Sequence, residues 1–250
     1  MVYDTIGNIA IIKFPKISLK EKKELAKELL AKHQNIKTIL EKTEKVSGKL
    51  RTYKTKLLAG KNTQETVHKE SACLFKLDVE KCYFSPRLSN DMLEIAKRIK
   101  KGKVLCLFSG VSPYPIIIAK RTPASKIIAI ELNPSCYKYA KENKILNKIG
   151  DKLEIIKGDA KTKIPKEKFD YIVMTRPQLK ETFLKQAFKA SKPGCIFFYH
   201  GFAKKIEDIK QEIENQAKLS KKKIKFLESW RNGDIAPYTY RFTLVFKTLN

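Results

Sequence analysis

The stretch Val104-Leu-Cys-Leu-Phe-Ser-Gly-Val-Ser-Pro-Tyr-Pro115 decides the fold, together with Ile127-Ile-Ala-Ile-Glu-Leu-Asn-Pro134 further along the chain. The first stretch reads as a buried apolar strand that breaks at Ser109-Gly110 and continues as an apolar helix. The second reads as a strand that ends on an acid, Glu131. Open α/β sheets bind adenosine ligands in this way, because a turn of small residues admits the ligand to backbone N–H groups and the acid accepts hydrogen bonds from two ribose hydroxyls. The two stretches therefore predict a nucleoside-cofactor site.

The glycine pattern of this turn is incomplete. Gly110 is its only glycine, Ser112 stands where a second glycine is expected, and Cys106 lies inside the strand where an acid is often found. An ordinary strand-turn-helix of an α/β core, with no ligand, is the alternative interpretation. The rest of the sequence has to decide between them.

The charge balance points to a polyanionic partner. The 250 residues include 53 Lys and Arg against 26 Asp and Glu, which gives a formal net charge of +27. A charge of this size attracts polyanions, with nucleic acid as the first candidate. The alternative is a lysine-rich surface that comes from genome composition or from life at high temperature, but there Glu rises with Lys, and here the acids do not keep pace.

The five cysteines form no CxxC pair and most lie in apolar segments, namely Cys73, Cys82, Cys106, Cys136 and Cys195. This pattern is typical of buried thiols in a reducing compartment, so neither a disulfide frame nor a metal site is expected. The sequence shows no signal peptide and no apolar run of membrane-spanning length. We expect a cytoplasmic protein.

Residues 1–85 are predicted to form a small α+β domain. A strand pair is expected in 3–13 about a Gly-Asn turn, and a helix over 18–32 that begins with a capping box of Ser18 and Glu21. Strands or strand-like segments follow at 38–44, 49–58 and 66–78. The segment is rich in cations, which favours an RNA-binding surface that supports catalysis: Lys45, Lys49, Arg51, Lys54, Lys56, Lys61 and Lys69.

Residues 86–250 alternate between strand and helix patterns. Helices are predicted at 90–100, 113–120, 135–146, 180–192 and 204–220, with strands at 104–108, 127–130, 153–156, 169–174 and 195–200 between them. This order predicts an α/β fold, a doubly wound and mostly parallel Rossmann-like sheet. Two closing strands around 223–229 and 238–246 suit an antiparallel edge.

Four strand ends then fall on one edge of the sheet. They carry Ser109-Gly110, Glu131, Asp159 and the loop Thr175-Arg-Pro-Gln178. Ligands of open α/β sheets bind at the carboxyl ends of the strands. A small turn, a ribose-binding acid, an acid at the adenine edge and a proline-bearing loop follow the order used by class I S-adenosylmethionine-dependent methyltransferases. S-adenosylmethionine is therefore the expected cofactor.

Several strings resemble one family, the archaeal and eukaryotic tRNA methyltransferases that act on the guanosine immediately 3′ of the anticodon. These strings are Lys45-Val-Ser-Gly48, Thr66-Val-His-Lys-Glu70, Tyr83-Phe-Ser-Pro-Arg87, Ile130-Glu-Leu-Asn-Pro134 and Gly158-Asp-Ala160. The resemblance implies tRNA, through its anticodon loop, as the partner of a monomeric enzyme. Family members usually carry a further N-terminal domain for the outer corner of the tRNA, and we expect that interaction to be missing here.

The resemblance also implies roles for matching positions. Arg51 stands where the family has an arginine that stabilises charge on the target base, and Asp91 stands where it has a glutamate general base. Alternatively, Asp91 is only an acid in the first turn of a helix, where the dipole favours one. The flipped base needs a stacking partner, for which Tyr83 is preferred over Phe84, Arg176 and Trp230. Cofactor contacts are implied at Arg87, Phe108, Ser109, Gly110, Glu131, Leu132, Asn133, Asp159 and Ala160.

The loop Thr175-Arg-Pro-Gln178 departs from the family, which has Asn-Leu-Pro-Lys there. The family's asparagine helps to hold guanine, so Thr175 and Pro177 become candidates for selecting the base. A related archaeal branch methylates carbon C7 of imG2, the tricyclic wyosine intermediate made from that guanosine. The hypothesis is C7 methylation of imG2, N1 methylation of guanosine, or both. A silent RNA-binding protein with this fold and a methyltransferase for another RNA or a protein amide are the alternatives.

Overall fold

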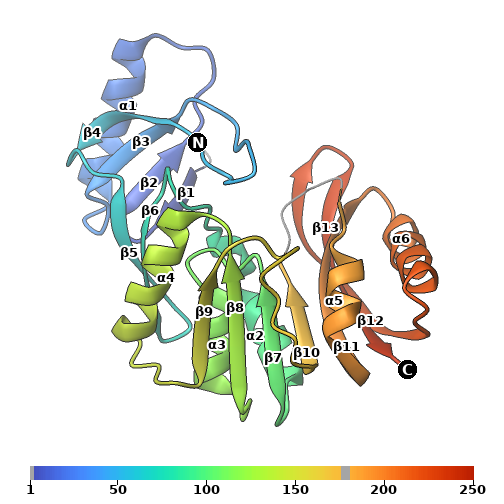
Figure 1. Cartoon of the computed structure of the whole chain (residues 1–250). Coiled ribbons are helices and arrows are strands. Elements are labelled where there is room, and N and C mark those ends of the chain that lie inside the picture. The colour runs from blue at the N-terminus through green and yellow to red at the C-terminus, as the bar shows by residue number, and fades with distance from the viewer. Residues whose placement is uncertain (1–2, 176–180) are drawn as a thin grey trace. The chain divides into compact units, whose positions relative to one another are not determined.

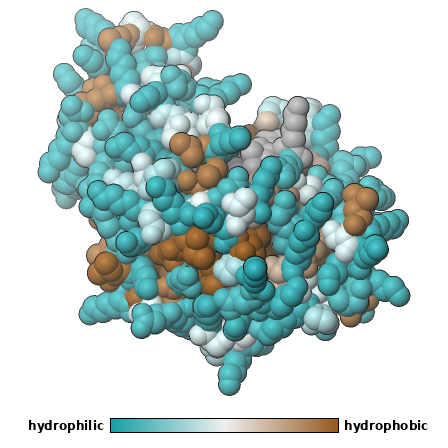
Figure 2. Space-filling view, in the orientation of Figure 1, coloured by the Kyte–Doolittle hydropathy of each residue, from teal (hydrophilic) through white to brown (hydrophobic). Residues whose placement is uncertain are grey.

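The computed structural model describes residues 3–175 and 181–250, and the chain divides into two compact units, Met1–Pro86 and Arg87–Asn250 (Figure 1). The division falls one residue beyond the predicted boundary. Hydrophilic side chains cover most of the face seen in Figure 2. Among the described residues, none of the helices is both long and apolar enough to cross a membrane.

The first unit contains a four-stranded sheet in the order β1-β2-β3-β4. β1 (Tyr3–Ile6) and β2 (Ile9–Ile12) pair antiparallel about a turn in which Gly7 has a φ of +56°. β2 pairs parallel with β3 (Thr38–Lys42), which pairs antiparallel with β4 (Thr55–Gly60). The predicted strand pair at the start of the chain is present.

Helix α1 (Leu19–Lys32) makes the crossover from β2 to β3. The Ser18 hydroxyl accepts the Glu21 N–H at 3.2 Å, and the Glu21 carboxylate accepts the Ser18 N–H at 2.8 Å. This reciprocal pair is the predicted capping box, which satisfies two N–H groups that a helix start leaves unpaired. Ala26 and Leu29 are buried and belong to the core of this sheet.

The segment 66–78 was expected to be one strand-like piece and is instead a hairpin of β5 (Glu65–Glu70) and β6 (Cys73–Asp78). Its turn residues, Ser71 and Ala72, have φ of +51° and +60°. Two-residue hairpin turns need this left-handed backbone, for which Gly, Asn and Asp are the usual residues. Because Ser-Ala carries no such signal, the alternation on either side reads as a single strand.

The second unit is built on a seven-stranded sheet in the order β12-β13-β11-β10-β7-β8-β9. Pairing is parallel from β11 to β9 and antiparallel at β13 and β12, so the predicted fold class and its antiparallel edge are confirmed. The strands are β7 (Lys103–Leu107), β8 (Lys126–Glu131), β9 (Leu153–Lys157), β10 (Phe169–Met174), β11 (Ser191–Ala203), β12 (Ile224–Ala236) and β13 (Thr239–Thr248).

Helices pack on both faces of this sheet, which buries both sides of the central strands. Alternate residues of the strands, such as Leu105, Ile172 and Phe197, share a core with α5 and α6, whereas α2 and α3 meet the opposite face through side-chain contacts described below. The helices are α2 (Ser89–Arg98), α3 (Pro113–Arg121), α4 (Pro134–Leu146), α5 (Leu184–Ala190) and α6 (Ile206–Leu219), with a short 3-10 helix, η1 (Pro86–Leu88), before α2.

The largest differences from the predicted bounds lie in β11 and β12, which are longer than expected, and in α5, which ends earlier. The helix expected to reach residue 192 ends at Ala190, because β11 begins at Ser191. The last residue of β10, Met174, pairs with Tyr199, so β11 continues for four residues beyond β10. β12 and β13 pair along this extension and project with it past the carboxyl ends of the parallel strands (Figure 1).

Candidate active site

The turn after β7 has an unusual backbone that only its position at the strand end explains. Phe108, Gly110 and Ser112 have φ of +62°, +57° and +66°. The Ser112 N–H donates to the Ser109 carbonyl at 2.8 Å, and the Ser109 N–H donates to the Ile130 carbonyl of β8 at 3.1 Å. Ser112 therefore adopts the left-handed backbone that a second glycine would supply, at a cost that Gly lacks.

Glu131, at the end of β8, is hydrogen-bonded to this turn. One carboxylate oxygen accepts the Gly110 N–H at 2.6 Å and the other accepts the Asn133 N–H at 2.7 Å. Burial raises the pKa of the Glu131 carboxyl, and the backbone N–H groups of Asn133, Gly110 and Leu132 oppose the rise. Each oxygen retains a lone pair for a further donor, so two vicinal ribose hydroxyls fit this carboxylate.

Two buried hydroxyls beside Glu131 have no hydrogen-bond partner within the described residues. They are Ser109 Oγ and Ser112 Oγ, and the two residues are 5% and 0% exposed. Buried hydroxyls are normally paired, and leaving one unpaired costs about 1–3 kcal/mol. Their position at the turn fits a polar ligand that would pair them, as a nucleoside cofactor does.

The remaining predicted cofactor residues fall into different environments. Asp159 follows β9, where the Gly158 N–H donates to the Glu131 carbonyl at 2.8 Å and so joins the two strand ends. Leu132 is partly exposed and Ala160 is buried. The Asn133 side chain accepts the Ser135 N–H at 2.9 Å and so caps the N-terminus of α4.

Thr175 connects the loop after β10 to the cofactor turn. Its hydroxyl donates to the Phe108 carbonyl at 3.3 Å, and the Phe108 ring packs edge-on against Phe183 with centroids 5.0 Å apart. Arg176, Pro177 and Gln178 lie outside the described residues. The loop that departs from the family thus begins within hydrogen-bond reach of the predicted cofactor turn.

Asp91, expected as the general base, is 3% exposed and surrounded by donors. Its Oδ2 lies 2.8 Å from His200 Nε2 and accepts the Tyr114 hydroxyl at 2.5 Å. Its Oδ1 accepts three more hydrogen bonds, from Trp230 Nε1 at 2.8 Å, Asn232 Nδ2 at 2.9 Å and Thr243 Oγ1 at 2.6 Å. These residues come from α3, β11, β12 and β13.

The donors around Asp91 also set its ionisation. Burial alone would raise the pKa of Asp91, but the adjacent His200 and the hydrogen bonds from His200, Thr243 and Tyr114 outweigh burial and hold the pKa well below its usual range. A carboxylate with five partners has little capacity left for a substrate proton. The surroundings of Asp91 therefore fit a positioning role better than the expected role of general base.

Stacking candidates differ in what already covers them. The Arg98 guanidinium lies 4.8 Å from the centre of the Trp230 ring, whose N–H is held by Asp91. Phe84 is buried against Phe75 and His68, so it is a core residue of the first unit. Tyr83 is 38% exposed. Of the aromatic candidates, Tyr83 is the one with substantial open ring surface.

Arg51 lies beside Tyr83 in the first unit. The Arg51 guanidinium is 5.7 Å from the centre of the Tyr83 ring, and Arg51 has a φ of +57° in the turn that follows Gly48. The structure thus brings together two residues that the sequence singled out separately. The other cations named for this unit are exposed, and Arg87 is exposed on η1 of the second unit.

Sequence reasoning missed the donors to Asp91. His200, Asn232 and Thr243 lie in strand patterns that give no sign of a buried carboxylate. In the part of the chain that the structure describes, no cluster of three or more His, Cys, Asp or Glu could hold a metal ion, and all five cysteines are buried free thiols.

Comparisons with known proteins agree with this geometry. The family described as "TRM5/TYW2 methyltransferase domain" matches residues 66–226, and "TYW2 N-terminal domain" matches residues 1–63. The tRNA (guanine(37)-N(1))-methyltransferase Trm5b of Pyrococcus abyssi is 32% identical over 249 residues, which is 98% of this chain and 74% of that protein. Its crystal structure superposes with a TM-score of 0.90 at 31% identity, covering 100% of this chain and 75% of that one.

The names of two further relatives include 4-demethylwyosine, and one of these names also includes guanine. The tRNA (guanine(37)-N(1))/4-demethylwyosine(37)-methyltransferase Taw22 of Nanoarchaeum equitans is 45% identical over 150 residues, 60% of this chain and 49% of that protein. The tRNA(Phe) (4-demethylwyosine(37)-C(7)) aminocarboxypropyltransferase of Methanocaldococcus jannaschii is 32% identical over 199 residues, 79% of this chain and 77% of that protein. The matched domain, together with the extent of the match to Trm5b, shows that this chain belongs to the TRM5/TYW2 methyltransferase family.

Proposed function

We propose that this chain transfers the methyl group of S-adenosylmethionine to the base at position 37 of tRNA, favouring C7 of 4-demethylwyosine, with N1 of guanosine as a second acceptor. Position 37 comes from the names of its relatives, and so does 4-demethylwyosine, which here takes the place of imG2 as the tricyclic acceptor. The observation that carries the preference is the saturated carboxylate of Asp91. The cofactor supplies an activated methyl group, and the chain's own residues supply position and electrostatics.

Cofactor binding is assigned to the strand ends of the second unit. Glu131 accepts the ribose hydroxyls, and the turn Ser109-Gly110 admits the cofactor close to the backbone, where the buried hydroxyls of Ser109 and Ser112 find partners. Asp159 and Ala160 border the adenine, with Phe108, Leu132 and Arg87 contributing further contacts. Holding the methyl donor in line with its acceptor supplies much of the rate in such a transfer.

Roles toward the target base are assigned to Arg51 and Tyr83 of the first unit and, independently, to Thr175 and Pro177 of the second unit. Tyr83 offers an exposed ring for stacking, and Arg51 beside it carries the positive charge that stabilises an oxyanion on the base. Thr175 has a shorter side chain than the family's asparagine and already donates to the Phe108 carbonyl. Thr175 therefore leaves more room for the base and offers guanine no side-chain amide to hydrogen-bond with. Both differences favour a base with a bulkier ring system.

The two acceptors make different demands on a base. N1 of guanosine carries a proton that must leave for nitrogen to attack, whereas C7 of the tricyclic ring attacks the methyl carbon with its π electrons first. The S–CH3 bond breaks as the C7–CH3 bond forms, which releases S-adenosylhomocysteine, and the C7 proton leaves afterwards. Because Asp91 is already paired with five donors, the carbon route suits this site better.

The deciding experiment compares two tRNAs that differ only at position 37, one with guanosine and one with 4-demethylwyosine. The chain is incubated with methyl-labelled S-adenosylmethionine, and the nucleosides are then identified by mass spectrometry. We expect faster labelling of 4-demethylwyosine. Labelling of guanosine alone would overturn the preference, and labelling of neither would overturn the function.

Aminocarboxypropyl transfer is a second candidate, because a relative with that activity matches 79% of this chain. The same cofactor then loses a different carbon group from its sulfur. A parallel incubation with S-adenosylmethionine labelled in its carboxyl group distinguishes the two reactions. Carboxyl label in the tRNA without methyl label would replace the methyl-transfer proposal.

One titration tests the alternative of a silent RNA-binding protein with this fold. Calorimetry with S-adenosylmethionine should show binding, because Glu131 and the serine hydroxyls are arranged for it. Absence of heat at every cofactor concentration would favour the silent protein. The monomeric state stays a prediction, which sedimentation at several protein concentrations checks.

A further inference from the structure

Strands β11, β12 and β13 extend together beyond the carboxyl ends of the parallel strands. Residues 200–203 of β11 pair with 240–243 of β13, and β13 pairs with 231–236 of β12. Figure 1 shows this part of the sheet continuing past the end of β10. We call it the ribbon. It lies at the same edge of the sheet as Thr175 and the cofactor turn.

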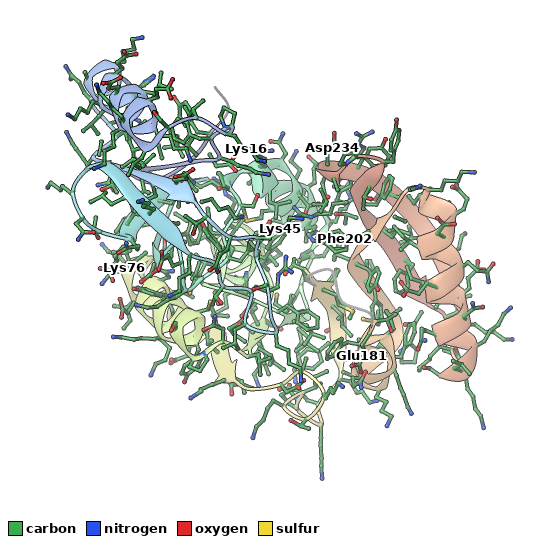
Figure 3. The ribbon with its side chains drawn as sticks, turned by 90° about the horizontal axis from the view of Figure 1, so that it is seen from above. Lys16, Lys45, Lys76, Glu181, Phe202 and Asp234 are labelled. Carbon is green, nitrogen blue, oxygen red and sulfur yellow. The ribbon has the colours of Figure 1, made fainter. Side chains whose placement is uncertain are left out.

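Aromatic rings and guanidinium groups gather on the ribbon. The Arg231 guanidinium lies 3.7 Å from the centre of the Tyr240 ring. Its Nε and Nη2 donate hydrogen bonds to Asp234 Oδ1 at 3.0 and 2.5 Å. The Tyr240 ring meets Phe242 nearly at right angles, with centroids 6.2 Å apart. Arg241, which is buried, lies 5.6 Å from the Phe202 ring, and Figure 3 labels Phe202 and Asp234 on this part of the sheet.

The core accounts for Phe242, which packs against it, but it does not account for Tyr238 and Tyr240. Further along β13, Leu244 and Phe246 lie on the same face and are fully buried under α5 and α6. Tyr240 and Phe242 continue that row toward the tip but are only partly buried, and Tyr238 is 73% exposed. A sheet end with no packing task would normally carry small polar residues.

The ribbon is also held firmly at its base. Four of the five donors to Asp91 belong to its strands, namely His200, Trp230, Asn232 and Thr243. They connect the three strands to α2 through one buried carboxylate. A surface fixed in this way loses little conformational freedom when it binds a partner.

We propose that the ribbon is a stacking platform for unpaired bases of an RNA loop, those that flank the modified base, and that Asp91 is the positioning residue that fixes it. Unpaired bases stack on exposed tyrosine and arginine planes with little regard to sequence. The net charge of +27 suits a phosphate backbone. The occupant rests on the proposed function, because a tRNA loop is the single-stranded RNA that such an enzyme meets.

The test uses the whole chain and an anticodon stem-loop that carries 2-aminopurine next to position 37. Stacking quenches this fluorophore. Tyr238→Ala and Tyr240→Leu should each weaken binding by about tenfold and reduce the quenching, since stacking of one base contributes on the order of 1–3 kcal/mol. Tyr137→Leu, a ring on α4, and Lys225→Gln, at the other end of β12, are the matched controls and should change binding by less than about twofold.

Three readouts separate the outcomes. Affinity for S-adenosylmethionine should be unchanged in both ribbon variants, because Tyr238 and Tyr240 lie on the ribbon and not at the cofactor turn. Asp91→Asn should reduce the quenching as well. Asp91→Glu should not restore the quenching, since the longer side chain misplaces all five donors. Normal tRNA modification with unchanged binding by Tyr238→Ala and Tyr240→Leu overturns the platform alone. Failure of the unaltered chain to bind the stem-loop overturns the proposed function and the platform together.

Discussion

Nε2 of His200 lies 2.8 Å from Oδ2 of Asp91, and both side chains are almost completely buried. The two residues are 109 positions apart in the chain and join the start of α2 to the extended end of β11. A buried pair of this kind is strongly destabilising to break, because the group left behind has no compensation. The pair favours a positioning role for Asp91 over the role of general base that the family resemblance implies.

Asp91→Asn should lower the free energy of unfolding by about 3–5 kcal/mol, the usual range for removing one partner of a buried charged pair. Urea unfolding followed by circular dichroism measures the change. Glu94→Gln, on the same helix but paired with Lys97 and Arg98 near the surface, is the control and should cost less than about 1 kcal/mol. A fully stable Asp91→Asn that has lost guanosine N1 methylation would restore the general-base role.

The stability supplied by Asp91 should depend on pH in one direction. Its pKa is lower in the folded chain than the ordinary value of 3.8, so the unfolded chain binds the proton more readily. The contribution is therefore complete above about pH 5 and is lost as pH falls below about 4 toward the folded pKa. Unfolding of the unaltered chain and of Asp91→Asn, measured from neutral pH downward, should show a gap that narrows in acid. A gap that widens in acid would contradict the assignment.

Glu131→Ala should weaken binding of S-adenosylmethionine by about tenfold to a hundredfold. Hydrogen bonds to a charged group contribute about 1.5–3 kcal/mol, and the variant also frees the Gly110 N–H that Glu131 holds. Calorimetric titration measures the affinity. Glu154→Gln, on the neighbouring strand β9 and partly exposed, is the matched control and should bind normally. Equal affinities for the two variants would remove Glu131 from the cofactor site.

Thr175→Asn should raise the rate of guanosine N1 methylation relative to 4-demethylwyosine methylation. The asparagine amide restores a donor and an acceptor at the start of the loop, and one positioned hydrogen bond is worth about 1–3 kcal/mol, or up to about a hundredfold in rate. The two-tRNA assay gives the ratio directly. Thr175→Ser keeps the hydroxyl and serves as the control. An unchanged ratio in Thr175→Asn would show that this position does not select the base.

Binding of tRNA should weaken steeply with salt, because each neutralised phosphate adds roughly −0.7 to −0.9 to the slope of log affinity against log salt. Lys49 and Lys56 are exposed cations of the first unit. Replacing both with Gln should make the slope shallower by that amount for each phosphate that is no longer neutralised, whereas Lys141→Gln on α4 should leave it unchanged. Filter binding at several salt concentrations measures the slope, and a flat dependence in the unaltered chain would contradict RNA binding.

Local sequence patterns predicted much of the fold. Alternating strands and helices gave the order of the second unit, and Ser18 with Glu21 gave the start of α1. The hairpin turn at Ser71-Ala72 was missed because its left-handed backbone is imposed by the pairing of β5 with β6 and not by the residue types. The length of β11 was missed because only its partners in the sheet extend it past His200.

The sequence by itself determined that Ser109-Gly110 and Glu131, the predicted cofactor residues, meet, because they lie at strand ends that a parallel sheet must bring to one edge. Only the tertiary structure shows which groups surround Asp91. Sequence shows an acid in the first turn of a helix, and five donors that lie 23 to 152 residues away meet it only when α3 and three strands pack around α2. The ionisation of a buried carboxylate depends on the groups within hydrogen-bond distance, and a chain's local pattern does not contain them.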